Sequence, residues 1–84
     1  MPLFMDVHEK LPDGATFDDV AGAHAADLAI QDQYDVSYVS YWVDEAAGAA
    51  FCLVKAPDAA AAERVHREAH GLVATRIHAV REGV

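Results

Sequence analysis

The chain has 84 residues, of which 14 are acidic and 6 basic, and a formal net charge of -8. The length predicts one domain over residues 1–84, and a domain this small gains stability from dimerisation. The acidic balance argues against nucleic acid and anionic membrane surfaces as partners, because both are bound through clustered Lys and Arg. It favours cations instead.

A single cysteine, Cys52, excludes an internal disulfide. No apolar run is long enough for a membrane span, and residues 1–6 lack the basic leader and apolar core of a signal peptide. We therefore expect a cytoplasmic protein.

The first half of the chain predicts a strand, a helix and a second strand. Alternation over residues 3–9 predicts a strand with Phe4, Asp6 and His8 on one face. Residues 12–14 form a turn signal, and Thr16 with Asp19 resembles a capping box that opens a helix over residues 17–33. The apolar stripe of this helix is expected to consist of Phe17, Val20, Ala21 and Leu28, with His24 inside it.

The second half predicts a hairpin, a helix and a last strand. The β-branched and aromatic run 36–43 predicts a strand that places Tyr38, Ser40 and Trp42 on one face. Residues 44–48 form the hairpin loop and 49–55 the returning strand. Pro57 then opens a helix that runs to about His70 and is capped by Gly71. Residues 75–81 predict the final strand, and the core stripe of the second helix is Ala62, Val65 and Ala69.

This order of elements predicts an α+β, ferredoxin-like βαββαβ fold. A four-stranded antiparallel sheet would carry both helices on one face. The bare face is expected to show Phe4, Tyr38 and Trp42 to solvent, which is more aromatic surface than a monomer usually exposes. We therefore expect a homodimer that forms through the sheet.

Histidines are the informative residues. His66 and His70 are four residues apart, beside the core stripe of one helix, so both imidazoles can reach a single ion. The predicted topology brings His8 to the same end of the domain, with His24 midway along the neighbouring helix, and leaves His78 apart. Two polar residues one and two turns after His24 could orient an imidazole: Asp27 and Gln31. The candidate metal ligands are His8, His24, His66, His70, Asp6 and Asp27.

Each of these residues also has a purely structural interpretation. The pair on the second helix could be solvated, His24 could be a half-buried histidine bonded to Asp27, and Asp6 with His8 could be polar residues of a solvated strand. Cys52 is expected to be a small core residue. A site of nitrogen and oxygen donors without thiolate favours Ni²⁺, Cu²⁺ or mononuclear Fe²⁺ over structural Zn²⁺, and the donor set does not separate these three ions.

Several segments resemble a family of small bacterial nickel-binding proteins that is otherwise a domain of unknown function. The segments are residues 5–8, 23–31, 41–42, 51–58 and 65–73, of which the HREAHG stretch is the most specific. The resemblance implies a ferredoxin-like fold, a homodimer, nickel near the dimer interface and no established catalytic activity. It points to His8, His24, His66 and His70 as ligand positions.

Three functions follow as hypotheses. The first is a transition-metal protein, acting as a nickel buffer, carrier or sensor. The second is a dimeric α+β-barrel enzyme, such as a metal-dependent oxygenase or isomerase, whose pocket between two sheets would be lined by Asp6, His8, Tyr38 and Trp42. The third is a ligand-sensing dimerisation module that uses the same pocket without chemistry.

Overall fold

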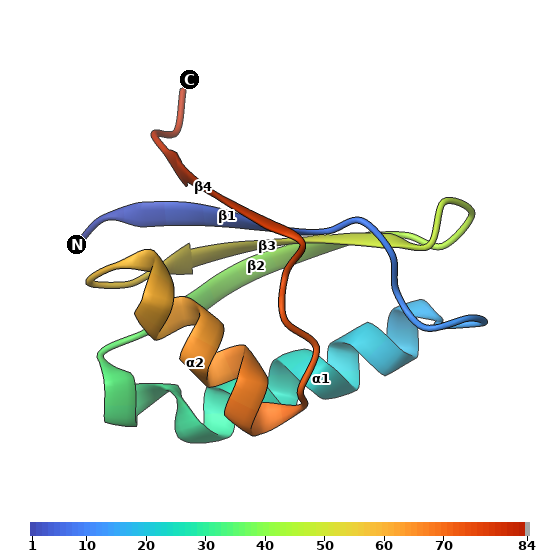
Figure 1. The fold of residues 1–84 in the computed structure, drawn as a ribbon, viewed down its shortest axis with the longest axis horizontal. Helices are drawn as coiled ribbons and strands as arrows, with labels where there is room; N and C mark the ends of the chain where they lie inside the picture. Colours follow the sequence, from blue (N-terminus) through green and yellow to red (C-terminus); the bar gives the residue numbers. More distant parts are fainter. Residues whose placement is uncertain (84) are drawn as a thin grey trace.

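The structure, a computed structural model, describes residues 1–83. Its elements are β1 (Leu3–His8), α1 (Phe17–Ile30), a 3₁₀ turn η1 (Gln31–Tyr34), β2 (Ser37–Asp44), β3 (Ala49–Lys55), α2 (Ala59–Ala69) and β4 (Arg76–Val80). The strands form one antiparallel sheet in the order β2-β3-β1-β4, and both helices lie on one face of it (Figure 1). The predicted α+β, ferredoxin-like fold is confirmed.

The helix boundaries follow from local capping chemistry. Thr16 and Asp19 form the predicted capping box, in which each side chain accepts the backbone N–H of the other residue. The second helix begins after Asp58, whose side chain accepts the N–H of Ala61, so Pro57 lies just outside the helix rather than opening it. Gly71 follows the end of α2 with a φ of 79°, a backbone conformation that glycine adopts without strain.

The inward side of α1 differs from the prediction. Phe17 and Leu28, assigned to the apolar stripe, are 48% and 46% exposed. The one buried residue of the helix is Asp27, which points at His66 and His70 at the end of α2. The spacing of apolar residues predicted the wrong inward side of α1. The buried centre of this helix is a carboxylate with partners on other elements, which the periodicity of apolar residues cannot detect.

Two of the three aromatic residues predicted on the bare face of the sheet lie on the opposite face. Tyr38 is buried and Phe4 packs against the hydrophobic core beneath the helices. A β-bulge between Tyr38 and Ser40 adds a residue to β2, so Tyr38 and Tyr41 both point inward. Strict alternation had assigned them to different faces.

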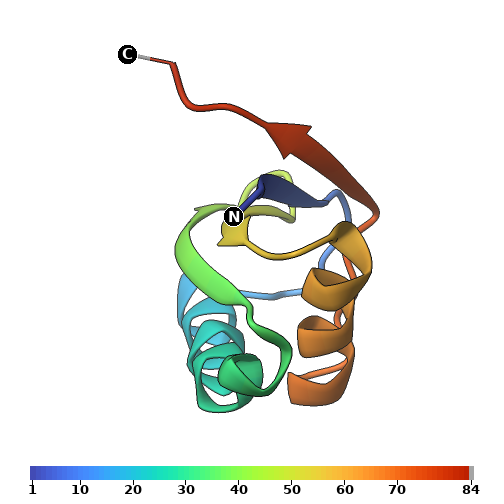
Figure 2. The ribbon, with the colours of Figure 1, turned by 90° about the vertical axis from the view of Figure 1, so that its left-hand side faces the viewer.

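The centre of the open face of the sheet is apolar. Trp42 pairs with Phe51 across β2 and β3, and these residues are 51% and 36% exposed. Val39, at the bulge, is 48% exposed. Figure 2 shows both helices below the sheet, on the side opposite the open face, which no helix covers. No helix within residues 1–83 has the length and apolar content that a membrane crossing requires.

Candidate metal centre

The centre of the site is the imidazole of His66, which is only 2% exposed. It lies in the last turns of α2, on the side facing the sheet, and not beside the core stripe as the sequence suggested. Each ring nitrogen lies within hydrogen-bond distance of a different carboxylate. Nε2 lies 2.9 Å from Asp6 Oδ2 on β1, and Nδ1 lies 2.9 Å from Asp27 Oδ1 on α1. The imidazole therefore links the sheet to both helices.

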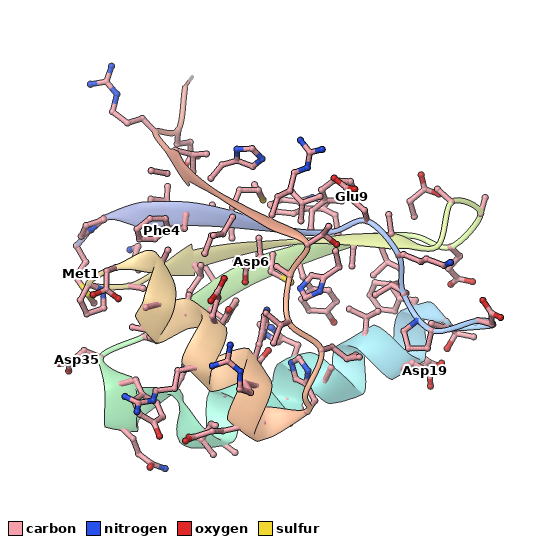
Figure 3. All side chains as sticks on the ribbon, in the orientation of Figure 1. Met1, Phe4, Asp6, Glu9, Asp19 and Asp35 are labelled. Atoms are coloured by element: carbon pink, nitrogen blue, oxygen red, sulfur yellow. The ribbon has the colours of Figure 1, made fainter. Side chains whose placement is uncertain are left out.

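Tyr38 supports this ring from β2. Its phenol stacks on the imidazole of His66, with ring centroids 4.4 Å apart. Its hydroxyl donates a hydrogen bond to Asp6 Oδ2 at 2.6 Å and lies 3.1 Å from the carbonyl oxygen of Ala62. Figure 3 shows Asp6 on the helix-covered side of the sheet, where it is fully buried. The inward orientation of Tyr38, set by the β-bulge, is therefore what completes the surroundings of Asp6.

His70 extends the cluster by one helical turn. Its Nε2 lies 3.0 Å from Asp27 Oδ1 and 3.1 Å from His66 Nδ1. Its other nitrogen, Nδ1, accepts the backbone N–H of Leu72 at 3.1 Å. A neutral imidazole that accepts at Nδ1 carries its proton on Nε2. This tautomer allows His70 to donate to Asp27.

The electrostatics of the cluster follow from burial and these contacts. Burial by itself would lower the pKa of His66, but the hydrogen bonds to Asp27 and Asp6 outweigh it and raise the pKa to about 11. Burial would raise the pKa of Asp27, whereas hydrogen bonds from His66 and His70 lower it. With two carboxylates and one imidazolium, this buried layer carries one net negative charge, which a divalent cation replacing the His66 proton would cancel.

His8, at the end of β1, approaches His66 from the sheet. The two Nε2 atoms are 3.4 Å apart, and the side chain of His8 is buried. Burial and the neighbouring positive charge of His66 lower the pKa of His8 to about 4, so this imidazole is neutral at pH 7. The thiol of Cys52 lies within 4.8 Å of the ligand atoms of both histidines.

His24 belongs to the wall of a cavity that opens beside the cluster. The cavity has a volume of about 180 Å³ and is lined by the side chains of both the cluster and α1. The ring of His24 packs on Tyr41, with centroids 4.6 Å apart, and does not bond to Asp27 in the described chain. Asp27, His66 and His70 line this cavity, together with His8 and Cys52.

Five of the six predicted ligand positions meet in one cluster, and His24 lies on the wall of the adjoining cavity. Gln31 is elsewhere, because its side chain accepts the backbone N–H of Tyr38. His78 pairs with Met5 at the exposed side of the sheet, apart from the cluster as predicted.

Two contributors were missed. Cys52 lies in the core as predicted, but the structure also places it opposite Asp6 in the sheet and next to His8 and His66, which was not expected. Tyr38 was assigned to the wrong face because the β-bulge has no signature in the sequence. The enzyme pocket predicted between two sheets is wrong in its composition, since Asp6, His8 and Tyr38 face the helices and only Trp42 faces outward.

The residue types suit a transition metal. Two sets of three donors lie within 4.8 Å of one another: Asp27 with His66 and His70, and His8 with Cys52 and His66. Imidazole, carboxylate and thiolate are the donors that bind nickel, copper, iron and zinc in proteins. In addition, Asp6 Oδ1 is buried and has no hydrogen-bond partner among the described residues, so the layer retains unused acceptor capacity.

Comparison with known proteins agrees with this chemistry. Residues 4–80 match the model of a family described as "Nickel responsive protein SCO4226-like". The crystal structure of SCO4226 from Streptomyces coelicolor A3(2) has a TM-score of 0.88 with this chain at 40% identity, and the match covers 98% of this chain and 99% of that one. The comparison with curated proteins found no match. This chain belongs to the SCO4226-like family of nickel responsive proteins.

Proposed function

We propose that this protein binds a divalent transition metal, nickel, through Asp27, His66 and His70, and serves as a buffer, carrier or sensor of that ion. The observation that carries the proposal is the spacing of the three donor atoms. Asp27 Oδ1, His66 Nδ1 and His70 Nε2 form a triangle with edges of 2.9, 3.0 and 3.1 Å. The description of the family, "Nickel responsive protein", supports nickel as the ion.

The size of this triangle favours right-angled coordination. Ligands on perpendicular bonds of about 2.1 Å lie about 3.0 Å apart, whereas tetrahedral bonds of the same length separate them by about 3.4 Å. Three mutually perpendicular bonds occupy one face of an octahedron and not three corners of a square plane, and imidazole donors suit nickel, copper and iron. The triangle therefore fits nickel better than structural zinc.

The surroundings of the triangle also suit a metal site. When His66 binds through Nδ1, its Nε2–H remains bonded to Asp6 Oδ2, which fixes the ring and increases its basicity. The adjoining cavity leaves room for water or a small ligand at the remaining coordination positions. His8 and His24 lie on the wall of that cavity and are the nearest further imidazoles.

The test is metal binding by untagged protein purified without a metal column. Elemental mass spectrometry would give the metal content, and calorimetric titration would give Ni²⁺ affinity and stoichiometry. We expect stoichiometric nickel for the wild type and the loss of tight binding for Asp27→Asn and His70→Ala. His66 is left unchanged because its removal threatens the fold.

The matched control is His78→Ala, which removes an imidazole from the opposite face of the sheet. Its nickel isotherm should equal that of the wild type. If Asp27→Asn and His70→Ala also bind nickel as the wild type does, the triangle is not the site.

An iron enzyme is the second candidate function. Two histidines and one carboxylate with open positions form the facial triad of non-haem Fe²⁺ oxygenases, and Asp27, His66 and His70 have this composition. Iron in the purified protein, together with oxygen consumption that requires a small organic substrate, would favour this function. Nickel in the purified protein without turnover would favour the first.

A homodimer formed through the open face of the sheet is part of the proposal. Trp42 and Phe51 form a cross-strand pair on that face, next to partly exposed Met5 and Leu53. An apolar patch of this kind is typical of an interaction surface. Light scattering of the wild type should give twice the chain mass of 9.0 kDa, and a chain mass at all concentrations would exclude the dimer. We expect the cytoplasm as the compartment, where the free thiol of Cys52 stays reduced.

A further inference from the structure

The cavity beside the histidine cluster is large enough for an organic molecule. Its volume is about 180 Å³. An apolar protein cavity of about 150 Å³ holds benzene, so a single six-membered ring with one short substituent fits here. Most of the lining lies outside the nickel triangle, since it comes from the loop after β1, from α1 and from β2 and β3.

The walls of this cavity are largely apolar and are held in place by the backbone. The N–H of Leu11 donates to the carbonyl oxygen of Gly48 at 2.8 Å, which ties the loop after β1 to the hairpin. In the same loop, the N–H of Ala15 donates to the carbonyl oxygen of Pro12 at 3.0 Å. A cavity that is formed before a ligand arrives needs little ordering on binding. The apolar side chains of the lining include Leu11, Pro12, Val20, Ala23, Ala50 and Leu72.

The charged groups of the lining are mainly acidic. Asp13, Asp19 and Asp27 line the cavity, and no Lys or Arg within residues 1–83 does. The imidazolium of His66 lies between Asp6 and Asp27, so its positive charge is already paired. The cavity therefore attracts a cation and repels an anion.

Asp27 provides a buried anchor for an organic cation. The residue is 2% exposed, and the hydrogen bonds from His66 and His70 both end on its Oδ1. Its Oδ2 receives no hydrogen bond from the described residues. Because buried carboxylate oxygens normally have a partner, Oδ2 is an acceptor for a donor that enters the cavity. Tyr41 adds an aromatic ring to the same lining, and aromatic rings also attract cations.

We propose that this cavity binds a small organic cation, a primary ammonium group carried on one ring or on a chain of similar size. The ammonium group donates to Asp27 Oδ2, and the apolar body lies against Leu11, Val20 and Ala23. Asp19, about two turns before Asp27 on α1, adds negative charge toward the other end of the cavity. This inference does not rest on the proposed nickel function, because it uses the free oxygen of Asp27 and walls that supply no metal ligand.

The test is a calorimetric titration of untagged protein, freed of metal with a chelator, with benzylamine, benzyl alcohol and benzoate. These probes share one ring and differ in charge, and without metal the amine nitrogen can bind only to the protein. We expect saturable binding of benzylamine. Benzyl alcohol should bind roughly tenfold more weakly, because hydrogen bonds between charged groups are about twice as strong as neutral ones. Benzoate should not bind.

Two variants of α1 form a matched pair. Ala23 lines the cavity, whereas Ala25 is exposed and does not. Leucine at position 23 would fill the space of the ring, so Ala23→Leu should lower benzylamine affinity by roughly tenfold or more and keep the wild-type nickel isotherm. Ala25→Leu should match the wild type for both ligands. Circular dichroism confirms that both variants fold, and the comparison of the three probes needs the wild type alone.

Three outcomes would overturn the ammonium site: no saturable binding of benzylamine, equal affinity for benzyl alcohol, or unchanged benzylamine affinity in folded Ala23→Leu. None of them bears on the nickel triangle, whose own test is the loss of nickel in Asp27→Asn and His70→Ala. A wild type that binds benzylamine but no nickel would keep this inference and remove the proposed function.

Discussion

Each face of the sheet carries residues that a small domain usually places elsewhere, although the hydrophobic core lies on the helix-covered face. The helix-covered face, which forms the interior, holds Asp6 and the imidazolium of His66, both almost fully buried. The open face holds Trp42 and Phe51, both exposed. A buried ionic layer is a weak source of stability and can be replaced by apolar residues at little cost. We infer that this chain keeps the layer for binding, while its apolar outer face is left for a second copy.

The largest expected effect comes from breaking the inner layer at its centre. In His66→Ala, Asp6 and Asp27 would remain buried without the cation between them. Removing one partner of a buried ion pair costs about 3–5 kcal/mol of unfolding free energy. Urea denaturation of the metal-free protein measures this loss, and a change under about 1 kcal/mol would show that the layer relaxes into solvent.

A smaller loss of unfolding free energy is expected when the hydroxyl of Tyr38, which bonds to the buried layer, is removed. Tyr38→Phe removes the hydrogen bond to Asp6 and keeps the stacked ring on His66. Hydrogen bonds to charged groups contribute about 1.5–3 kcal/mol, and we expect a loss in this range in urea denaturation. The matched control is Tyr41→Phe, also on the inner face, where the described structure has no hydroxyl contact and we expect a change below about 0.5 kcal/mol. Equal losses in the two variants would contradict the role of Asp6.

A substitution on the open face of the sheet should change the association of two chains and leave the fold of the single chain unchanged. Trp42→Asp places a carboxylate at the centre of the proposed dimer interface, where it would be buried without a partner. We expect light scattering to report a monomer, while circular dichroism stays that of the wild type because Trp42 is half exposed in the single chain. A dimer that survives this substitution would exclude the open face as the interface.

The smallest expected effect is local and links the inner layer to the strand that follows it. A metal on His70 Nε2 displaces the proton from that nitrogen, so Nδ1 takes up a proton and can no longer accept the N–H of Leu72. We expect faster hydrogen exchange at the Leu72 amide in nickel-loaded protein, with little change in β3. Unchanged exchange at Leu72 in nickel-loaded protein would show that His70 does not bind the ion through Nε2.

Local signals in the sequence were sufficient for the elements and the fold. The capping pair Thr16 and Asp19, Gly48 in the hairpin and Gly71 after α2 are short-range features, and each is found where it was expected. The βαββαβ order leaves few ways to arrange four strands and two helices. The convergence of His8, His66 and His70 followed from that topology, because strand and helix directions fix which ends meet.

What the sequence by itself determined is therefore the order of elements, the fold, and the end of the domain at which the histidines gather. Only the tertiary structure decided which face of the sheet the polar residues of β1 occupy, because alternation separates two faces without stating which one the helices cover. The β-bulge that turns Tyr38 inward and the burial of His66, Asp27 and Cys52 arise from contacts among distant segments. Those contacts depend on packing, which determines where a buried charge finds its partner.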